Sequence, residues 1–209
     1  MLRIESCDGI KGIESSSSLP LLEELILIDS SEFLSSGLPD VPNLRTLKIE
    51  DDGSERLPDG GWERLPALQR LKIWNCEGLK CLPDGLAQLQ LLQQLLIGYN
   101  NQFESLLEAL GQLKKLKWLH ICSLGALTCL PDSIGQLESL QHLEIMDCEA
   151  LGSLPHGLQN LLLLKVLQIE HCLQLSERCK PEEGVDWPNI SHIRYISING
   201  ERTRGRNQR

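Results

Sequence analysis

The sequence predicts an α/β solenoid of about nine coils, with a curved parallel β-sheet on its concave face and short helices, 3-10 turns and loops on its convex face. The first reason is a 24-residue period marked by five leucines, each opening a similar phrase: Leu68, Leu92, Leu116, Leu140 and Leu164. A period of this length is typical of coils that stack on one another. The second reason is the alternation of apolar and polar residues within each phrase, which predicts one short strand per coil.

We number the positions of a coil from this leucine, which is position 0. Apolar residues then recur at positions 3, 5, 11, 14, 18 and 21, most clearly in residues 140–161. In the second half of the coil they stand three and four apart after a proline, as in residues 82–89, 130–137 and 154–161. This spacing predicts one or two turns of helix or 3-10 helix on the convex side, with the proline at the start.

The coils outside this regular run keep the same strand spacing. Their expected strand cores are Leu22-Leu25-Leu27, Leu44-Leu47-Ile49 and Ile193-Ile196-Ile198. Leu2 and Ile4 match positions 3 and 5, so the first coil is truncated, and we expect a C-terminal fragment of a longer protein or a chain that pairs there with another polypeptide. Trp62 and Trp187 replace the usual aliphatic residue of the coil and are expected in the core.

The expected domains are the repeats at 1–175, a polar insertion with the closing coil at 176–201, and a basic disordered tail at 202–209. The insertion itself, residues 176–186, is polar and is expected to loop out. Serines at residues 15–18 predict a turn of low complexity between two early coils.

The charge of the chain argues against binding to nucleic acid. Of 20 basic and 29 acidic residues, the tail holds four arginines and no acid, so the other 201 residues carry 16 − 29 = −13. Nucleic-acid binding needs a basic surface. No stretch is apolar and long enough for a membrane span or a signal peptide, which predicts a cytoplasmic protein. The basic tail leaves a nuclear location open.

Four of the eight cysteines share position 8 of the coil: Cys7, Cys76, Cys148 and Cys172. We expect buried free thiols of a reducing compartment at this inward position, where Asn100 stands in another coil. Cys81 and Cys129, five places further on, receive the same interpretation. A zinc site is the alternative, but the chain lacks two Cys-x2-Cys pairs, and we expect neither metal nor cofactor.

Positions 2, 4, 6 and 7 point away from the predicted core, and they vary between coils while the core positions stay nearly constant. Diverse surface positions on a constant frame can encode one particular partner. Exposed aromatic residues and methionine gathered there are typical of protein-binding hot spots. The candidate partner-binding residues are Lys72, Trp74, Tyr99, Trp118, His120, His142, Glu144, Met146 and His171.

Two alternatives remain open for these residues. Trp74 and Trp118 could lean along the sheet and only cover neighbouring backbone. The histidines at 120, 142 and 171 could bind a metal or sense pH, although hydrogen-bonding surface histidines are more common.

No catalytic residues are expected, and the chain is not expected to be an enzyme. It contains no GxSxG elbow, no HExxH helix and no phosphate-binding G-x4-GK[ST] loop. Cys122 and His120 lie on the same side of one strand, but that spacing separates them by about 7 Å. This separation exceeds hydrogen-bond reach for a nucleophile and its base.

The repeated phrase, as in residues 68–89 and 140–161, closely resembles the leucine-rich repeats of plant nucleotide-binding immune receptors. The closing segment, residues 178–200, resembles that of the coiled-coil class of these receptors. The resemblance implies an intracellular module that recognises a pathogen effector or a guarded host protein and that restrains a nucleotide-binding domain of the parent receptor. The chain itself contains no phosphate-binding loop and no coiled coil. The resemblance does not extend to individual contact residues, since these differ between receptors.

Two alternative functions come from other classes of protein. One is a stand-alone leucine-rich-repeat signalling scaffold or adaptor. The other is a repeat module of a bacterial ubiquitin-ligase effector, although no room remains in 209 residues for its separate catalytic domain.

Overall fold

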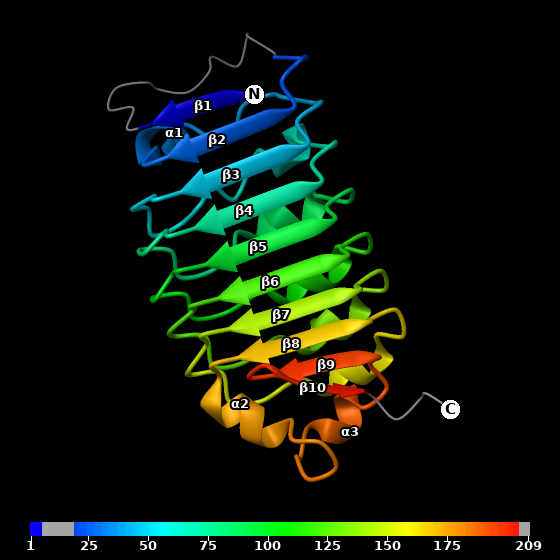
Figure 1. Cartoon of the computed structure of the whole chain (residues 1–209). Helices are drawn as coiled ribbons and strands as arrows, with labels where there is room; N and C mark the ends of the chain where they lie inside the picture. The colour runs from blue at the N-terminus through cyan, green and yellow to red at the C-terminus, as the bar shows by residue number, and fades with distance from the viewer. Residues whose placement is uncertain (6–18, 205–209) are drawn as a thin grey trace.

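The computed structural model describes residues 1–5 and 19–204, which form a ladder of ten strands with short helices behind it (Figure 1). The strands follow chain order across the sheet. Neighbours from β1 to β9 are parallel, and β10 is antiparallel to β9. The strands are β1 (Leu2–Glu5), β2 (Glu24–Ile28), β3 (Thr46–Glu50), β4 (Arg70–Trp74), β5 (Gln94–Gly98), β6 (Trp118–Cys122), β7 (His142–Met146), β8 (Val166–Glu170), β9 (Tyr195–Ile198) and β10 (Glu201–Arg204). The predicted solenoid is confirmed.

Residues at the same position of successive coils face each other across the sheet. Leu71 pairs with Leu95, and Leu95 pairs with Leu119, so position 3 forms one continuous row. Because side chains alternate along a strand, positions 3 and 5 point to the helices and positions 2, 4 and 6 point to the opposite face. We call this opposite face the concave face. The register predicted from the leucine period is therefore correct.

Short helices line the convex side of the stack. They are the 3-10 helices η1 (Trp62–Arg64), η2 (Asp84–Gln88), η3 (Glu108–Gln112), η4 (Asp132–Gln136) and η5 (His156–Asn160), and the α-helices α1 (Ser31–Ser35), α2 (Leu173–Arg178) and α3 (Trp187–Ile190). Pro83, Pro131 and Pro155 occupy the N-cap positions of η2, η4 and η5 with extended backbone. The proline thus lies one residue before the first helical position, which its missing N–H and fixed φ permit.

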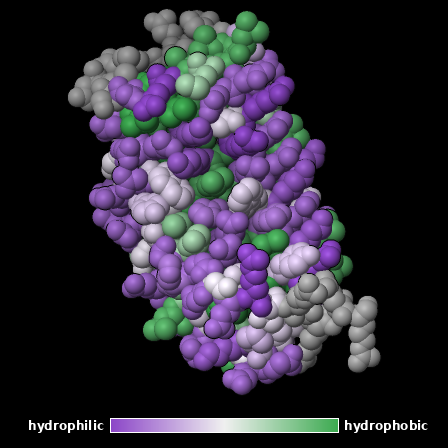
Figure 2. Space-filling model, in the orientation of Figure 1, coloured by the Kyte–Doolittle hydropathy of each residue, from purple (hydrophilic) through white to green (hydrophobic). Residues whose placement is uncertain are grey.

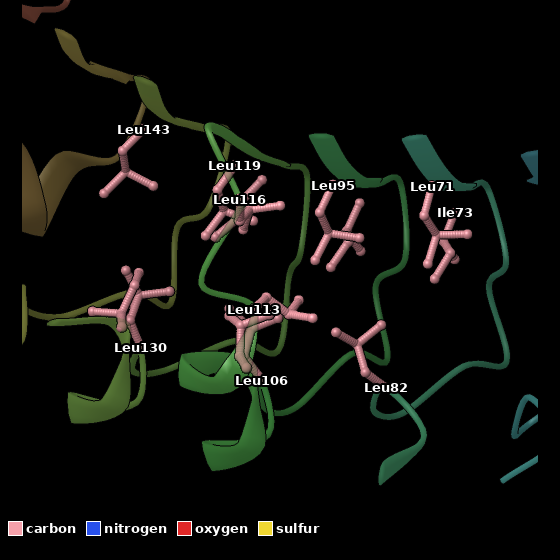
Figure 3. Packing of buried hydrophobic residues seen from close by; sticks show 14 of the residues in the cluster. Leu71, Ile73, Leu82, Leu95, Leu106, Leu113, Leu116, Leu119, Leu130 and Leu143 are labelled. Carbon is pink, nitrogen blue, oxygen red and sulfur yellow. The ribbon is translucent and has the colours of Figure 1, made fainter. Parts of the chain in front are cut away.

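The core is a single, mainly aliphatic cluster that runs the length of the solenoid. Figure 3 shows Leu71, Leu95, Leu119 and Leu143 projecting from the strands toward leucines of the convex half of the coil. Each inward leucine contacts its equivalents in the coils above and below, so stability depends on stacking between neighbouring coils. Trp62 and Trp187 are buried in this core, as predicted.

A left-handed turn ends each strand from β2 to β8. Position 7 has φ between 46° and 55° in seven coils, at Asp29, Asp51, Asn75, Tyr99, Ser123, Asp147 and His171. In six of these coils the backbone N–H donates to the position-6 carbonyl of the next strand, as from Tyr99 to Cys122 at 2.9 Å, whereas the N–H of His171 donates to the side-chain Oδ1 of Asn199 at 2.9 Å. At position 8, the side-chain Oδ1 of Asn100 accepts a hydrogen bond from the N–H of Cys76 at 2.6 Å. These bonds satisfy the buried backbone of the turn.

The prediction that residues 176–186 loop out is correct only for the middle of the segment, where residues 180–183 and Val185 are exposed. The segment begins inside α2, and Asp186 at its end is buried. The Asp186 carboxylate accepts two hydrogen bonds from Arg178, at 2.8 and 2.9 Å, and one from the backbone N–H of Leu154 at 3.0 Å. These bonds attach the end of the segment to the preceding coil, while its middle is exposed to water.

The predicted disordered tail begins too early, because residues 201–204 form β10. Asn199 and Gly200 both have positive φ, at 48° and 80°, which is the geometry of a two-residue hairpin turn. The Asn-Gly pair is a strong local hairpin signal that the sequence interpretation overlooked. The expectations for Cys7, for the serines at 15–18 and for residues 205–209 lie outside the described residues.

Candidate protein-binding face

The concave face carries the variable residues of the coil on nine neighbouring parallel strands. Figure 2 shows this face as mainly hydrophilic, with apolar side chains breaking the surface near its middle and at its upper end. The sheet and the core behind it hold each side chain at a defined height along the stack. The face is therefore a rigid surface whose chemistry changes from coil to coil.

Trp74 is the centre of one aromatic group. Its ring centroid lies 5.0 Å from that of Tyr99 and 6.0 Å from that of His120, with the His120 ring nearly parallel. The Lys72 ammonium lies 4.7 Å from the centroid of the indole ring, within cation–π distance. Strands β4 and β6 and the turn after β5 thus contribute to one group.

Gly98 makes this arrangement possible. A Cβ atom built on Gly98 would lie 2.6 Å from the six-membered ring of Trp74, closer than real contacts allow. The indole therefore lies flat across β5, where the missing side chain leaves room. The alternative that a tryptophan leans along the sheet and covers backbone is correct for Trp74, which is half-buried.

Trp118 forms a second aromatic group with His142, which is the residue that pairs with it on the next strand. Their ring centroids lie 5.8 Å apart with an interplanar angle of 38°. Trp118 is 37% exposed and Tyr99 is 48% exposed. Large aromatic surfaces at this exposure, on a face otherwise rich in polar residues, are available for contact with a partner.

His120 and His171 each contact an acidic side chain, whereas His142 packs against Trp118, so the three do not form one cluster. His120 Nδ1 lies 2.9 Å from Glu144, and His171 Nδ1 lies 3.0 Å from Asp147 at the strand-end turn. Within residues 1–5 and 19–204, no three side chains of metal-ligand type are placed to hold one ion. Met146 is half-buried at the end of β7, opposite Cys122 of β6.

Most thiols are poorly suited to chemistry. Cys122 is buried, and its Sγ lies 3.4 Å from the hydroxyl of Ser123, while His120 on the same strand binds Glu144. Burial raises the pKa of Cys76 to about 11 and that of Cys179 to about 12. The hydrogen bond with Cys172 and burial together raise the pKa of Cys148. Protonated thiols of this kind are weak nucleophiles.

Free buried cysteines are confirmed at the position-8 sites 76, 148 and 172. The same expectation is wrong for Cys81, which is half-buried, and for Cys129, which is exposed. Both side chains stand one residue before an inward leucine, at position 13, where the chain passes the edge of the coil. At this edge of the coil, the residue that precedes an inward leucine directs its side chain away from the core.

A polar depression of about 240 Å³ lies on the concave face over β2 to β5. Two ion pairs border it, with Lys48 Nζ 2.9 Å from Glu24 and Lys72 Nζ 2.7 Å from Glu50. The hydrogen bond from Lys48 lowers the pKa of Glu24 below its usual range. Arg70 also lines the depression, and sequence reasoning missed it, although a basic residue at position 2 is a readable signal.

A larger cavity of about 560 Å³ lies at the carboxyl-terminal end of the sheet. It is lined by Val166, Gln168, Tyr195, Ser197, Arg202 and Thr203. Sequence reasoning missed this cavity because residues 202 and 203 belong to β10, which was assigned to the tail.

Comparison with known proteins supports the fold assignment. A family model described as R13L1/DRL21 LRRs matches residues 98–172. Among solved structures, a leucine-rich-repeat protein of Leptospira interrogans has 22% identity and a TM-score of 0.55 over 86% of this chain and 55% of its own. Listeria monocytogenes InlP has 21% identity and a TM-score of 0.59 over 86% and 47%. Toll of Drosophila, in its complex with Spätzle, has 16% identity and a TM-score of 0.57 over 86% and 30%.

The chain is a leucine-rich-repeat domain, as its register, its fold and these matches agree. It spans about half the length, or less, of these structural relatives. A comparison with curated protein sequences gave no match. No helix in the described part of the chain combines the length and apolar character that crossing a membrane requires.

Proposed function

We propose that this domain is the protein-recognition module of a plant immune receptor of the nucleotide-binding, coiled-coil class. It binds a pathogen effector or a guarded host protein through the concave face. Support comes from the repeat phrase, from the closing segment, and from the match of residues 98–172 to a family of resistance-gene-related repeats. In the parent receptor it also contacts the nucleotide-binding domain and restrains it. This function places the module in the cytoplasm.

The observation that carries the proposal is the contrast between the two faces of the sheet. The inward positions repeat leucine and isoleucine from coil to coil, whereas the concave positions carry exposed Trp118 beside His142 and exposed Tyr99 beside Trp74. Exposed aromatic side chains lose little conformational entropy on binding and bury a large area. A surface of this kind stabilises a complex more than it stabilises the free fold.

The backbone of Tyr99 supports the same conclusion. Tyr99 has φ of 55°, in the left-handed region that asparagine and aspartate occupy at the equivalent Asn75, Asp51 and Asp147. A bulky residue there costs roughly 1 kcal/mol. The aromatic ring is therefore kept at a position where asparagine would serve the fold better.

A two-hybrid screen against a library of pathogen effectors and host proteins tests the proposal. Each interacting protein is retested with Trp118→Ala and with the control Leu163→Ala, which removes an exposed leucine outside the sheet. We expect Trp118→Ala to weaken binding at least tenfold, as at a hot spot, while Leu163→Ala has little effect. Partners that bind both variants equally well would contradict recognition through the concave face. Co-precipitation of a separately expressed nucleotide-binding domain of a plant receptor tests the intramolecular contact.

A further inference from the structure

We propose that the polar depression over β2 to β5 receives a carboxylate of the protein partner, and that Arg70 is the residue that binds it. This inference rests on the proposed function, because it specifies the chemistry of the partner at the same face. The geometry points to an acidic side chain that lies next to an aromatic or large apolar one in the partner.

The ion pairs of the depression single out Arg70. Lys48 is paired with Glu24, and Lys72 is paired with Glu50 while also lying over the Trp74 ring. Within the described part of the chain, these pairs leave Arg70 as the exposed cation of the depression without a carboxylate in salt-bridge contact. Its guanidinium keeps the donors that bind a carboxylate through two parallel hydrogen bonds.

The surroundings favour one carboxylate over a polyanion. The depression holds about 240 Å³, which suits a side chain. Glu24 lines it, Glu50 is paired with the lining residue Lys72, and the turns at Asp29 and Asp51 add acidic residues at the strand ends. These negative charges would repel a nucleic-acid backbone or an anionic membrane. A protein segment with a single acidic residue meets less of this repulsion than a polyanion does.

The position of Arg70 links the depression to the aromatic surface. Arg70 pairs with Gln94, and Gln94 pairs with Trp118, so all three lie in the position-2 row. Two strand spacings separate Arg70 from Trp118 by about 10 Å. Residues about three apart in an extended peptide span this distance. One partner segment that runs along the stack can therefore place its acid at Arg70 and its apolar side chain at Trp118.

Selection of random peptides displayed on phage, with the folded full chain as target, tests the inference. We expect selected peptides to carry Asp or Glu two to four residues from an aromatic or large apolar residue. Arg70→Ala should weaken these peptides at least about tenfold, the loss typical of a hydrogen-bonded charge. Arg70→Lys should recover only part of the affinity. The matched control Arg45→Ala removes an exposed arginine one strand away and should have no effect.

The outcomes separate this inference from the proposed function. Peptides that lose binding with Trp118→Ala but not with Arg70→Ala would overturn the carboxylate site and leave concave-face recognition intact. Selected peptides without acidic residues would do the same. Peptides insensitive to both variants, or no binders at all, would overturn both proposals. Binding of single-stranded DNA or of phosphatidylserine vesicles that depends on Arg70 would also overturn the inference, because it would assign the site to a polyanion.

Discussion

Replacement of Leu143 by alanine measures directly how much one inward residue stabilises the solenoid. Leu143 lies in the middle of β7 with no exposed surface, between Leu119 of β6 and Leu167 of β8. The change removes about three carbon atoms from the core, which costs about 2.4 kcal/mol in transfer free energy. The cavity that remains adds to this loss, so the free energy of unfolding should fall by about 2–5 kcal/mol.

The matched control is Leu162→Ala, because Leu162 is 84% exposed in the turn before β8. The same chemical change there should alter stability by no more than about 0.5 kcal/mol. Urea denaturation followed by far-ultraviolet circular dichroism gives both values under one condition. Equal losses for the two variants, or a loss near zero for Leu143→Ala, would refute the assignment of inward and outward positions.

Three further predictions address the site, the closing segment and the thiols. Gly98→Ala should displace the Trp74 indole and weaken partner binding. The free energy of unfolding, measured by thermal unfolding, should change by less than about 1 kcal/mol, because the lost ring contacts offset the stability gained by replacing a flexible glycine in a strand. Unchanged binding would contradict the role of the ring's position. Asp186→Ala should cost about 1–3 kcal/mol in urea denaturation, because it leaves the backbone N–H of Leu154 without its partner, while Arg178, which is 39% exposed, can turn to water; a cost below about 0.5 kcal/mol would show that the Asp186 hydrogen bonds do not stabilise the fold. The pKa of Cys76 is raised from 9.0 to about 11, so the stability it contributes is complete below pH 9 and is lost as pH rises through 11. Cys76→Ala should flatten this alkaline decline in denaturation midpoints, and an identical decline would exclude the thiol as its cause.

Local signals in the sequence were enough for most of the fold. The leucine period placed the strands, and the proline-led spacing placed the convex 3-10 helices, because each coil presents the same packing requirement to its neighbours. The Asn199-Gly200 turn was equally readable, since both residues favour positive φ. It was overlooked because the segment that follows was interpreted by its charge alone.

The candidate site was predictable in location but not in detail. The alternating direction of side chains along each strand placed Trp118 and His142 on adjacent strands of one face, as the structure shows. The orientation of Trp74 depends on Gly98, a residue 24 positions away whose missing side chain makes room for the ring. The alternating direction of side chains also could not show that Lys48 and Lys72 would form ion pairs with glutamates while Arg70 stays exposed. Ion pairs depend on side-chain positions in neighbouring coils.

The sequence by itself determined the repeating coil, its register and its inward residues, because burial of leucine at fixed intervals admits only one way of stacking. The tertiary structure alone decided which polar residues are buried and which surface residues remain available. Asp186 looks like part of a solvated loop until the fold brings it to the N–H of Leu154, 32 residues earlier. Contacts of that kind depend on where two distant segments meet in space, and residue type at either position does not specify them.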